Sequence, residues 1–188
     1  MLFDTHCHLN AEQFKGEIEP ILMNAQQAGV EFILVVGFDD QTIEDAIRLA
    51  DTYEHIYAAV GWHPVDAVDC TPENLARIEQ LMTHPKVVAV GEIGLDYHWD
   101  KSPHEVQQAL FEQQIELALK YDKPIIVHDR EAHQAVYETL KKYAPRGLRG
   151  VMHSYSASSE MVKAFTELGF MISLSGVVTL KTLKCQKK

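Results

Sequence analysis

The 188-residue sequence has few cysteines and no long apolar run, and each shortage excludes a class of protein. Its three cysteines, Cys7, Cys70 and Cys185, are widely spaced and odd in number, which argues against a disulfide framework and predicts reduced thiols. The apolar stretches, such as 32–37, fall far short of the roughly 20 residues that cross a bilayer. The N-terminus lacks a basic region followed by an apolar run, so we expect no secretory signal, no membrane association and a cytoplasmic location.

Positive charge is also scarce, because 17 Lys and Arg residues face 27 Asp and Glu residues and leave a formal net charge of -10. Phosphate binding normally relies on Lys and Arg, so this balance counts against a general basic surface for nucleic acid. A nucleic-acid substrate would need bound cations or a local basic patch. With 46% hydrophobic residues and no visible linker, the chain is expected to form one domain over residues 1–188.

Short apolar runs rich in β-formers alternate with segments of helical period along the whole chain. This alternation is typical of parallel strands joined by crossover helices. We predict seven strands, at residues 2–5, 31–37, 56–61, 87–92, 125–128, 150–153 and 170–174. A complete (β/α) barrel has eight strands in about 250 residues, so seven predict either an open doubly wound sheet or a TIM-type barrel without its eighth strand.

Local signals mark several helices between these strands. Apolar residues repeat at helical spacing over 18–25 and 43–50, and Gly29 follows the first of these segments as a C-terminal cap. Thr71 and Ser102 each precede a proline, which places a capping side chain before a proline at the first helical position. Helices are therefore predicted to begin after both residues.

Chemically active side chains recur at the C-terminal ends of the predicted strands. In a barrel those ends converge on one mouth, where sites are built from several strands, whereas an open sheet would spread them along a line. Independent accidents would not share this register, so we favour the barrel and a functional site. The strand-end residues are His6, His8, His63, Glu92, His128 and His153; we interpret His55, His84, His98, His104 and His133 as structural.

The spacing of these residues predicts a metal site. His6 and His8 are two residues apart, so both side chains lie on one face of an extended strand and can chelate one cation. Imidazole suits Zn, Mn, Ni or Fe and carboxylate suits Mg, so a mixed set does not name the metal. Glu92 is the one strand-end carboxylate in this set that could bridge two cations ~3.5–4 Å apart, the spacing used for phosphate ester hydrolysis.

The ordered motifs of the chain resemble the TatD family of metal-dependent deoxyribonucleases. The resemblance rests on Asp4-Thr5-His6-Cys7-His8, Gly61-Trp62-His63-Pro64, Gly91-Glu92-Ile93-Gly94-Leu95-Asp96-Tyr97, Pro124-Ile125-Ile126-Val127-His128 and His153-Ser154-Tyr155-Ser156.

The resemblance implies a cofactor, a substrate and roles for these residues. It implies that His6, His8 and Glu92 hold one divalent cation and that Glu92, His128 and His153 hold a second, with Mg, Mn or Zn as the candidates. It also implies His63 as a contact to the substrate phosphate, so that Glu92 and His63 are the catalytic residues. The implied reaction is hydrolysis of phosphodiester bonds in DNA, with exonuclease action at single-stranded ends.

Side chains next to these motifs have two interpretations each. Arg130 could bind a phosphate oxygen bidentately, or it could be a surface arginine in the first turn of a helix. Trp62, Tyr97, Trp99 and Tyr155 could stack nucleobases or belong to the core.

The family's last motif, an aspartate in a Glu-Thr-Asp-x-Pro context at the end of the eighth strand, has no counterpart before Lys188. We therefore expect a barrel that is incomplete at its C-terminus. Its first and seventh strands would lack the neighbour that closes the barrel. Self-association of two chains through these open edges is a further hypothesis.

Two other functions remain open from the sequence. A metal-dependent amidohydrolase acting on a small substrate also uses His-x-His on its first strand, and the acidic composition suits a small substrate. Many such enzymes bridge their metals with a modified lysine, whereas this chain has Glu92. The second alternative is an inactive metal-binding relative that lacks the terminal aspartate.

Overall fold

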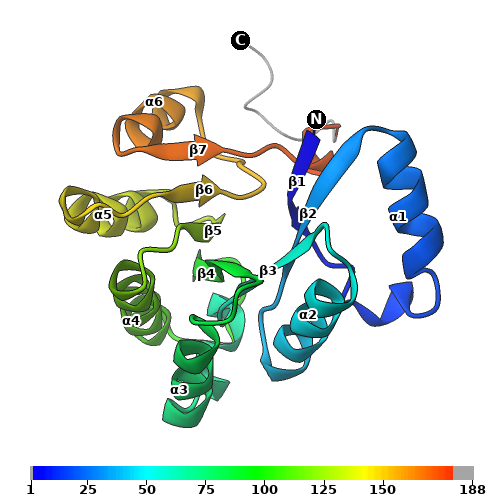
Figure 1. Ribbon diagram of the computed structural model, residues 1–188. Coiled ribbons are helices and arrows are strands. Elements are labelled where there is room, and N and C mark those ends of the chain that lie inside the picture. The colour runs from blue at the N-terminus through cyan, green and yellow to red at the C-terminus, as the bar shows by residue number, and fades with distance from the viewer. Residues whose placement is uncertain (1, 180–188) are drawn as a thin grey trace.

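The computed structural model describes residues 2–179, which form a seven-stranded parallel sheet with helices on its outer side (Figure 1). The strands run in chain order across the sheet: β1 (Leu2–Cys7), β2 (Val30–Val36), β3 (Ile56–Val60), β4 (Val87–Asp96), β5 (Ile125–Arg130), β6 (Gly150–Met152) and β7 (Phe170–Ile172). The helices between them are α1 (Ile18–Gln27), α2 (Asp40–Thr52), α3 (Pro72–Leu81), α4 (His104–Lys120), α5 (His133–Tyr143) and α6 (Ser159–Glu167).

The sheet is curled around an axis as in a TIM barrel, but it is not closed (Figure 1). Within residues 2–179, β1 pairs with β2 alone and β7 with β6 alone, so these two strands are the edges of the sheet. The predicted fold class, a TIM-type (β/α) barrel of seven strands, is confirmed, and the doubly wound alternative is wrong. The family's last aspartate has no counterpart in the sequence before Lys188, and the C-terminal residues to which this statement refers lie outside the described residues.

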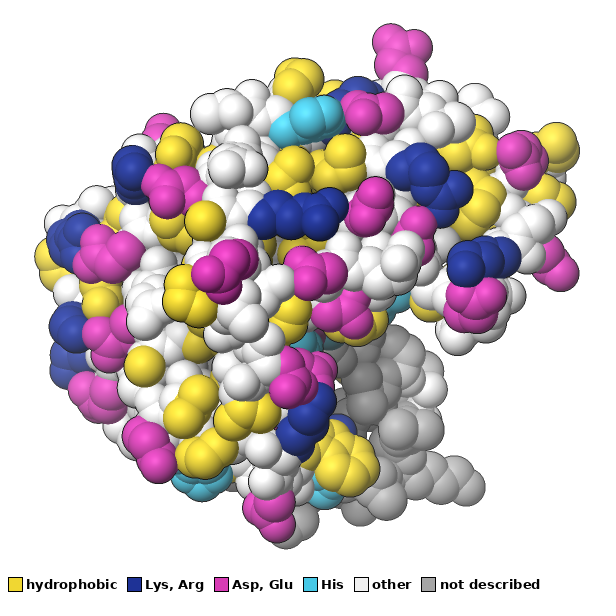
Figure 2. Space-filling model, turned by 90° about the horizontal axis from the view of Figure 1, so that it is seen from below, with side chains coloured by type: hydrophobic (Ala, Val, Ile, Leu, Met, Phe, Trp, Pro, Cys, Tyr) yellow, Lys and Arg dark blue, Asp and Glu magenta, His cyan; other side chains and the backbone are white. Residues whose placement is uncertain are grey.

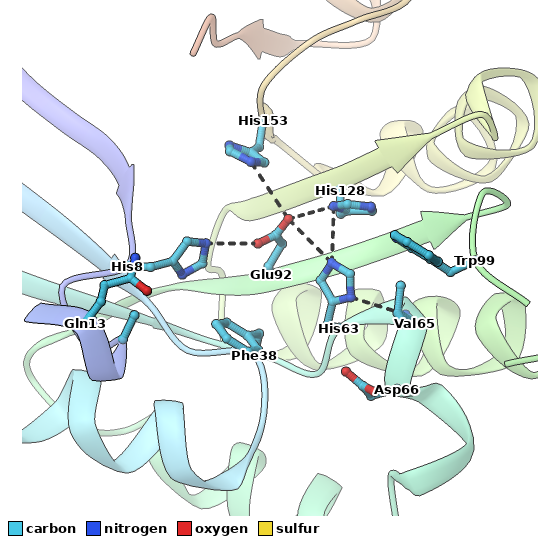
Figure 3. Close-up of a pocket in the computed structure, with 11 residues that line it drawn as sticks. His8, Gln13, Phe38, His63, Val65, Asp66, Glu92, Trp99, His128 and His153 are labelled. Atoms are coloured by element: carbon cyan, nitrogen blue, oxygen red, sulfur yellow. Dashed lines mark hydrogen bonds and ion pairs between the residues drawn. The ribbon is translucent and has the colours of Figure 1, made fainter. Parts of the chain in front are cut away.

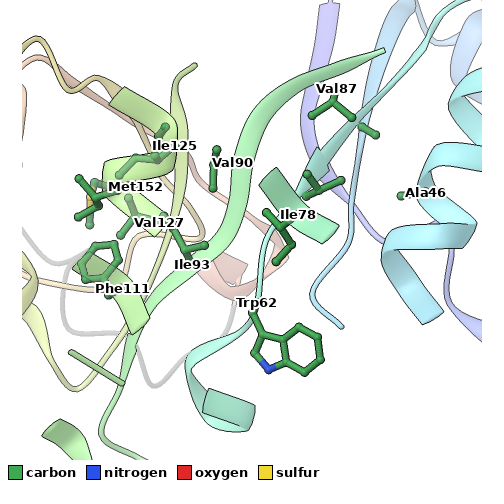
Figure 4. Packing of buried hydrophobic residues seen from close by; sticks show 14 of the residues in the cluster. Ala46, Trp62, Ile78, Val87, Val90, Ile93, Phe111, Ile125, Val127 and Met152 are labelled. Atoms are coloured by element: carbon green, nitrogen blue, oxygen red, sulfur yellow. The ribbon is translucent and has the colours of Figure 1, made fainter. Parts of the chain in front are cut away.

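The core has two layers because strand side chains alternate between the two faces of the sheet. The outer layer packs strand residues such as Val90 and Ile125 together with helix residues such as Phe111 (Figure 4). The inner layer, on the concave face, is small and consists of Leu34, Val36, Ala59, Ala89 and Ile126. Strands buried on both faces explain why the predicted runs were almost continuously apolar.

One predicted helix start is confirmed and the other is wrong in detail. Thr71 caps α3, with its hydroxyl accepting from the Asn74 backbone N–H and Pro72 in the first turn. Ser102 does not cap α4, which has Pro103 at its N-cap position and no side-chain cap. The Ser102 hydroxyl instead donates to Val65 O at 2.8 Å, in the 3-10 helix η2 (Pro64–Asp69).

Three strands near the candidate site extend further than the sequence predicted. β4 continues four residues beyond Glu92 and pairs with β5 as far as Asp96, opposite Arg130. Glu92 therefore lies inside a strand and not at its end. Gly94 permits this close pairing, since its φ is +149° and a Cβ there would lie 2.0 Å from His128 O. β1 and β5 also extend, to Cys7 and Arg130, whereas β6 and β7 stop one and two residues short of the predicted ends.

The surface is mixed in charge. On the face seen in Figure 2, acidic and basic side chains of the described residues alternate, and no continuous basic patch covers it.

No helix within residues 2–179 combines the length and apolar character needed to cross a membrane. Cys7 and Cys70 are free thiols, and burial raises the pKa of Cys7 to about 12, while Cys185 lies outside the described residues.

Candidate metal centre

The carboxylate of Glu92 is the centre of a cluster of histidines at the mouth of the barrel (Figure 3). Its side chain is 5% exposed. Oε2 lies 3.4 Å from His6 Nε2 and 3.7 Å from His8 Nε2. Oε1 lies 2.8 Å from His128 Nδ1 and 3.9 Å from both His63 Nε2 and His153 Nε2. The structure therefore brings together all six residues that the sequence predicted from five separate strands.

The fold explains this convergence. His6 lies in β1 with His8 just beyond it, His63 follows β3, and His153 follows β6. In a parallel curled sheet these positions lie at the same end of the barrel. His128 lies in β5 directly opposite Gly94 in the register with β4, which places its ring beside Glu92.

Two histidines have the ring orientation of a metal ligand. The Nδ1 of His8 lies 3.2 Å from the carbonyl oxygen of Val36, so Nδ1 carries the proton and the lone pair of Nε2 faces Glu92. The Nε2 of His128 lies 2.8 Å from Asp96 Oδ2, so in the neutral ring Nε2 carries the proton and Nδ1, 2.8 Å from Glu92 Oε1, is the nitrogen available to a cation. Ligating histidines usually donate their second ring N–H to a carbonyl or carboxylate in this way.

His63 has the opposite orientation. Its Nδ1 accepts from the backbone N–H of Val65 at 3.2 Å, so in the neutral ring the proton lies on Nε2. That N–H points into the cluster, 3.3 Å from His128 Nδ1. His63 is therefore arranged to donate a hydrogen bond into the site and not to offer a lone pair.

The crowding of acceptor atoms shows that the donor set fits divalent cations. His6 Nε2 and His8 Nε2 approach to 3.1 Å, and the lone pair of His8 Nε2 is directed at this point. Atoms of His6, Glu92 and His153 lie within 4.8 Å of one another, and so do atoms of His63, Glu92 and His128. Converging nitrogen lone pairs around a carboxylate repel one another unless a cation or a proton lies between them.

The protonation pattern supports the same interpretation. Burial and the charge of His128 lower the pKa of His63 to about 4, and burial lowers the pKa of His153 to about 4. Burial alone would raise the pKa of Glu92, but contacts with His128 and His6 hold it well below its ordinary value. Burial would likewise lower the pKa of His128, but hydrogen bonds to Asp96 and Glu92 raise it to about 9. Near pH 7 the site therefore has an ionised Glu92 beside a protonated His128 and neutral His63 and His153.

Two cavities adjoin the cluster and share His128 and His153. The first, of about 580 Å³, has Phe38 and Trp99 in its wall. The second, of about 540 Å³, is more polar and includes Arg130. The cluster thus lies between two spaces, each large enough for part of an extended substrate.

Comparison with known proteins identifies the family. The family model described as TatD related DNase matches residues 3–188. The chain belongs to the TatD family. Proteins that it resembles include the uncharacterized metal-dependent hydrolase YabD of Bacillus subtilis, which is 47% identical over 188 residues, covering 100% of this chain and 74% of the relative.

Two further proteins resemble this chain, one compared by its structure and one by its sequence. The crystal structure of YjjV, a TatD homologue from Escherichia coli K12, superposes with a TM-score of 0.89 at 36% identity, covering 95% of this chain and 70% of the other. The protein named 3'-5' ssDNA/RNA exonuclease TatD of Edwardsiella piscicida is 32% identical over 176 residues, covering 93% of this chain and 68% of the relative. The chain is thus a metal-dependent hydrolase of the TatD family with groups of residues suited to metal binding.

The aromatic residues that could stack nucleobases or belong to the core, and Arg130, differ in exposure and in contacts. Trp62 and Tyr155 are 5% and 6% exposed and belong to the core. Tyr97 is half-buried and stacks on His104. Trp99 is 53% exposed at the rim of the first cavity, with the Arg130 guanidinium 5.7 Å from its ring centre. Within residues 2–179, that guanidinium makes no hydrogen bond or ion pair, so it is free to bind an anion.

Sequence reasoning missed the residue that supports His128. Asp96 entered the sequence analysis only as a letter of the TatD motif, yet its side chain is 1% exposed and contacts the His128 ring. The signal was present, because Glu92 and Asp96 are four residues apart and therefore lie on one face of a strand. It was missed because the strand was predicted to end at Glu92.

Proposed function

We propose that this chain hydrolyses phosphodiester bonds of DNA, acting as an exonuclease at single-stranded ends. The observation that carries the proposal is the convergence of five histidine rings on the buried Glu92, with His8 and His128 each turning toward the cluster the nitrogen that is not bound to Val36 O or Asp96. The TatD-family relative from Edwardsiella piscicida named as an ssDNA/RNA exonuclease supports nucleic acid as the substrate class.

The proposed cofactor is a pair of divalent cations, Mg, Mn or Zn. His6, His8 and Glu92 would hold one cation, and Glu92, His128 and His153 the other. When bound, such cations supply Lewis acidity and lower the pKa of a coordinated water from ~15.7 to around 7. They also provide the positive charge that the acidic surface lacks, which removes the main compositional objection to a DNA substrate.

The remaining residues would bind and orient the substrate. The Nε2–H of His63 would donate to a phosphate oxygen, since its other nitrogen is occupied by Val65 N–H. Arg130, whose guanidinium has no protein anion among residues 2–179, would bind a phosphate on the side of the second cavity. The exposed face of Trp99 would stack a nucleobase in the first cavity, a contact worth ~1–3 kcal/mol per base.

The test is metal-dependent hydrolysis of single-stranded DNA by this chain and by Glu92→Gln and His128→Ala variants. We expect turnover with Mg²⁺ or Mn²⁺ that is lost in both variants. His55→Ala is the matched control, because it removes a histidine outside the cluster, and it should keep full activity. Turnover that persists in Glu92→Gln would contradict the proposal.

Turnover of a second substrate class distinguishes the proposed function from the two alternatives, an amidohydrolase and an inactive metal-binding relative. Turnover of a cyclic amide or lactone, with none of a phosphodiester model compound, would favour the amidohydrolase alternative. Binding of Mn²⁺ without turnover of either substrate class would favour the inactive metal-binding relative. Each of these results is distinguishable from a chain that binds no metal.

A further inference from the structure

The two carboxylate oxygens of Asp96 have different partners. Oδ2 lies 2.8 Å from His128 Nε2, at the metal cluster. Oδ1 accepts from the backbone N–H groups of His98 at 3.0 Å and Trp99 at 3.1 Å, in the loop that follows β4. One buried side chain therefore contacts both a candidate metal ligand and the loop that carries the exposed tryptophan.

The main chain of Asp96 is held from the helix side. Gln107, fully buried in α4, accepts from Asp96 N at 2.8 Å and donates to Asp96 O at 2.8 Å. The same amide nitrogen donates to Ser102 O at 2.9 Å, at the far end of the loop. Because both backbone groups of Asp96 are fixed, its carboxylate has little freedom to move toward one partner at the expense of the other.

The Oδ2 contact sets the chemistry of His128. In the neutral ring, an N–H···carboxylate hydrogen bond at Nε2 fixes the proton there, so that Nδ1, 2.8 Å from Glu92 Oε1, is the nitrogen that would bind a cation. A carboxylate behind a ligating imidazole also raises the basicity of the ligand, and loss of such a partner typically weakens metal affinity about 10- to 100-fold.

The Oδ1 contact sets the position of Trp99. Its two backbone hydrogen bonds form a tight turn directly after β4, which holds the indole at the cavity wall beside Arg130. Further along the loop, His98 Nδ1 forms an exposed pair with Glu131 Oε1 at 2.8 Å, and the Ser102 hydroxyl donates to Val65 O at 2.8 Å at the far end. Asp96 is thus the buried side chain that holds the part of the loop next to Trp99.

We infer that Asp96 is a positioning residue that sets both the metal ligand His128 and the nucleobase platform Trp99. The inference rests on the proposed function, because one oxygen of Asp96 would act on a metal ligand and the other on the loop that contacts a nucleobase of the DNA substrate. Metal affinity and the position of the aromatic ring at the rim then depend on one side chain.

The decisive variant is Asp96→Asn. Its amide has one oxygen acceptor, so it cannot accept from His128 Nε2–H and from the loop N–H groups through two separate oxygens. We expect Mn²⁺ affinity, measured by calorimetry, to fall about 10- to 100-fold. We also expect acrylamide quenching of Trp99 fluorescence to increase, with the Trp99 signal obtained by difference from a Trp99→Phe chain.

Glu131→Gln is the matched control. It weakens the exposed contact of the same loop with His98 without touching Asp96 or His128, so Mn²⁺ affinity should stay at the wild-type value. Circular dichroism and the melting temperature identify a variant that is not folded. If Asp96→Asn does not fold, the ring tautomer of His128 in the Mg²⁺-loaded wild-type chain, read from nitrogen NMR shifts, decides the metal half, and a proton on Nδ1 would overturn the inference.

The outcomes separate this inference from the proposed function. A wild-type chain that binds no Mn²⁺ would overturn both. A wild-type chain that binds Mn²⁺, with an Asp96→Asn variant whose affinity is unchanged, would overturn this inference alone. A loss of affinity with unchanged Trp99 quenching would overturn the coupling, because the loop would then be held without the carboxylate.

Discussion

Glu92 and Glu112 lie in two regions of the molecule with contrasting partners. Glu112, on α4, accepts from Lys142 Nζ at 2.6 Å and Tyr143 OH at 2.7 Å on α5. Gln108 of its own helix is a further neighbour, donating at 2.9 Å. Glu112 is thus fully satisfied by the chain itself, with its charge balanced by a lysine.

Glu92 is more deeply buried than Glu112, yet no lysine or arginine pairs with it among residues 2–179. Its neighbours are histidines, and those with pKa values of about 4, His63 and His153, are neutral near pH 7. Protonated His128, with a pKa of about 9, can balance the charge of Glu92, and a divalent cation held at His128 Nδ1 would replace that proton as the counter-charge. We expect this difference to separate a structural carboxylate, Glu112, from a metal-binding one, Glu92.

The sharpest test of this comparison is metal-induced stabilisation. With Mn²⁺ at about 100 times its Kd, binding to the folded state should raise the free energy of unfolding by ~2.7 kcal/mol. Glu92→Gln should lose this gain, whereas Glu112→Gln should keep it. Thermal melts with Mn²⁺ and with EDTA measure both. An equal metal-induced shift in the two variants would break the comparison.

The next effect concerns His63, which we propose donates a hydrogen bond to the substrate and does not bind metal. His63→Ala removes an N–H directed at the proposed phosphate position, and a hydrogen bond to a charged group contributes ~1.5–3 kcal/mol, or about 10- to 100-fold in kcat/KM. Mn²⁺ affinity should change less than about threefold, because the lone pair of His63 Nδ1 is used by Val65 N–H. Parallel calorimetry and steady-state kinetics measure the two quantities. A large loss of metal affinity would show that His63 is a ligand.

The sequence was sufficient to predict the strands and the cluster because both follow from local rules. Apolar β-rich runs predict β2 to β5. The recurrence of histidines and a glutamate at the predicted strand ends is enough to identify His6, His128 and the other cluster residues. These rules act over a few residues and do not depend on tertiary partners. The TatD-family motifs added the implied roles.

What the sequence did not predict depends on contacts between distant segments. Ser102 was predicted as a helix cap, but its hydroxyl is used by Val65, 37 residues earlier in the chain. The paths of β1, β4 and β5 beyond their apolar runs depend on pairing with neighbouring strands, as Asp96 with Arg130. The orientation of the His63 ring depends on a single backbone N–H, and the spacing of residues in the sequence does not predict it.

The smallest effect tests the structural side of the comparison at low pH. Hydrogen bonds from Lys142 and Tyr143 lower the pKa of Glu112 to about 2 from an ordinary 4.5. A carboxyl group with a lowered folded pKa stabilises the fold above its unfolded pKa, and this contribution is lost as the pH falls through the folded pKa. The difference in unfolding free energy between wild type and Glu112→Gln should therefore shrink between pH 4.5 and about 2. Because the pair is partly exposed, the total difference should stay below about 1 kcal/mol. Urea melts across this window measure it, and a difference independent of pH would mean that packing, not charge, accounts for the role of Glu112.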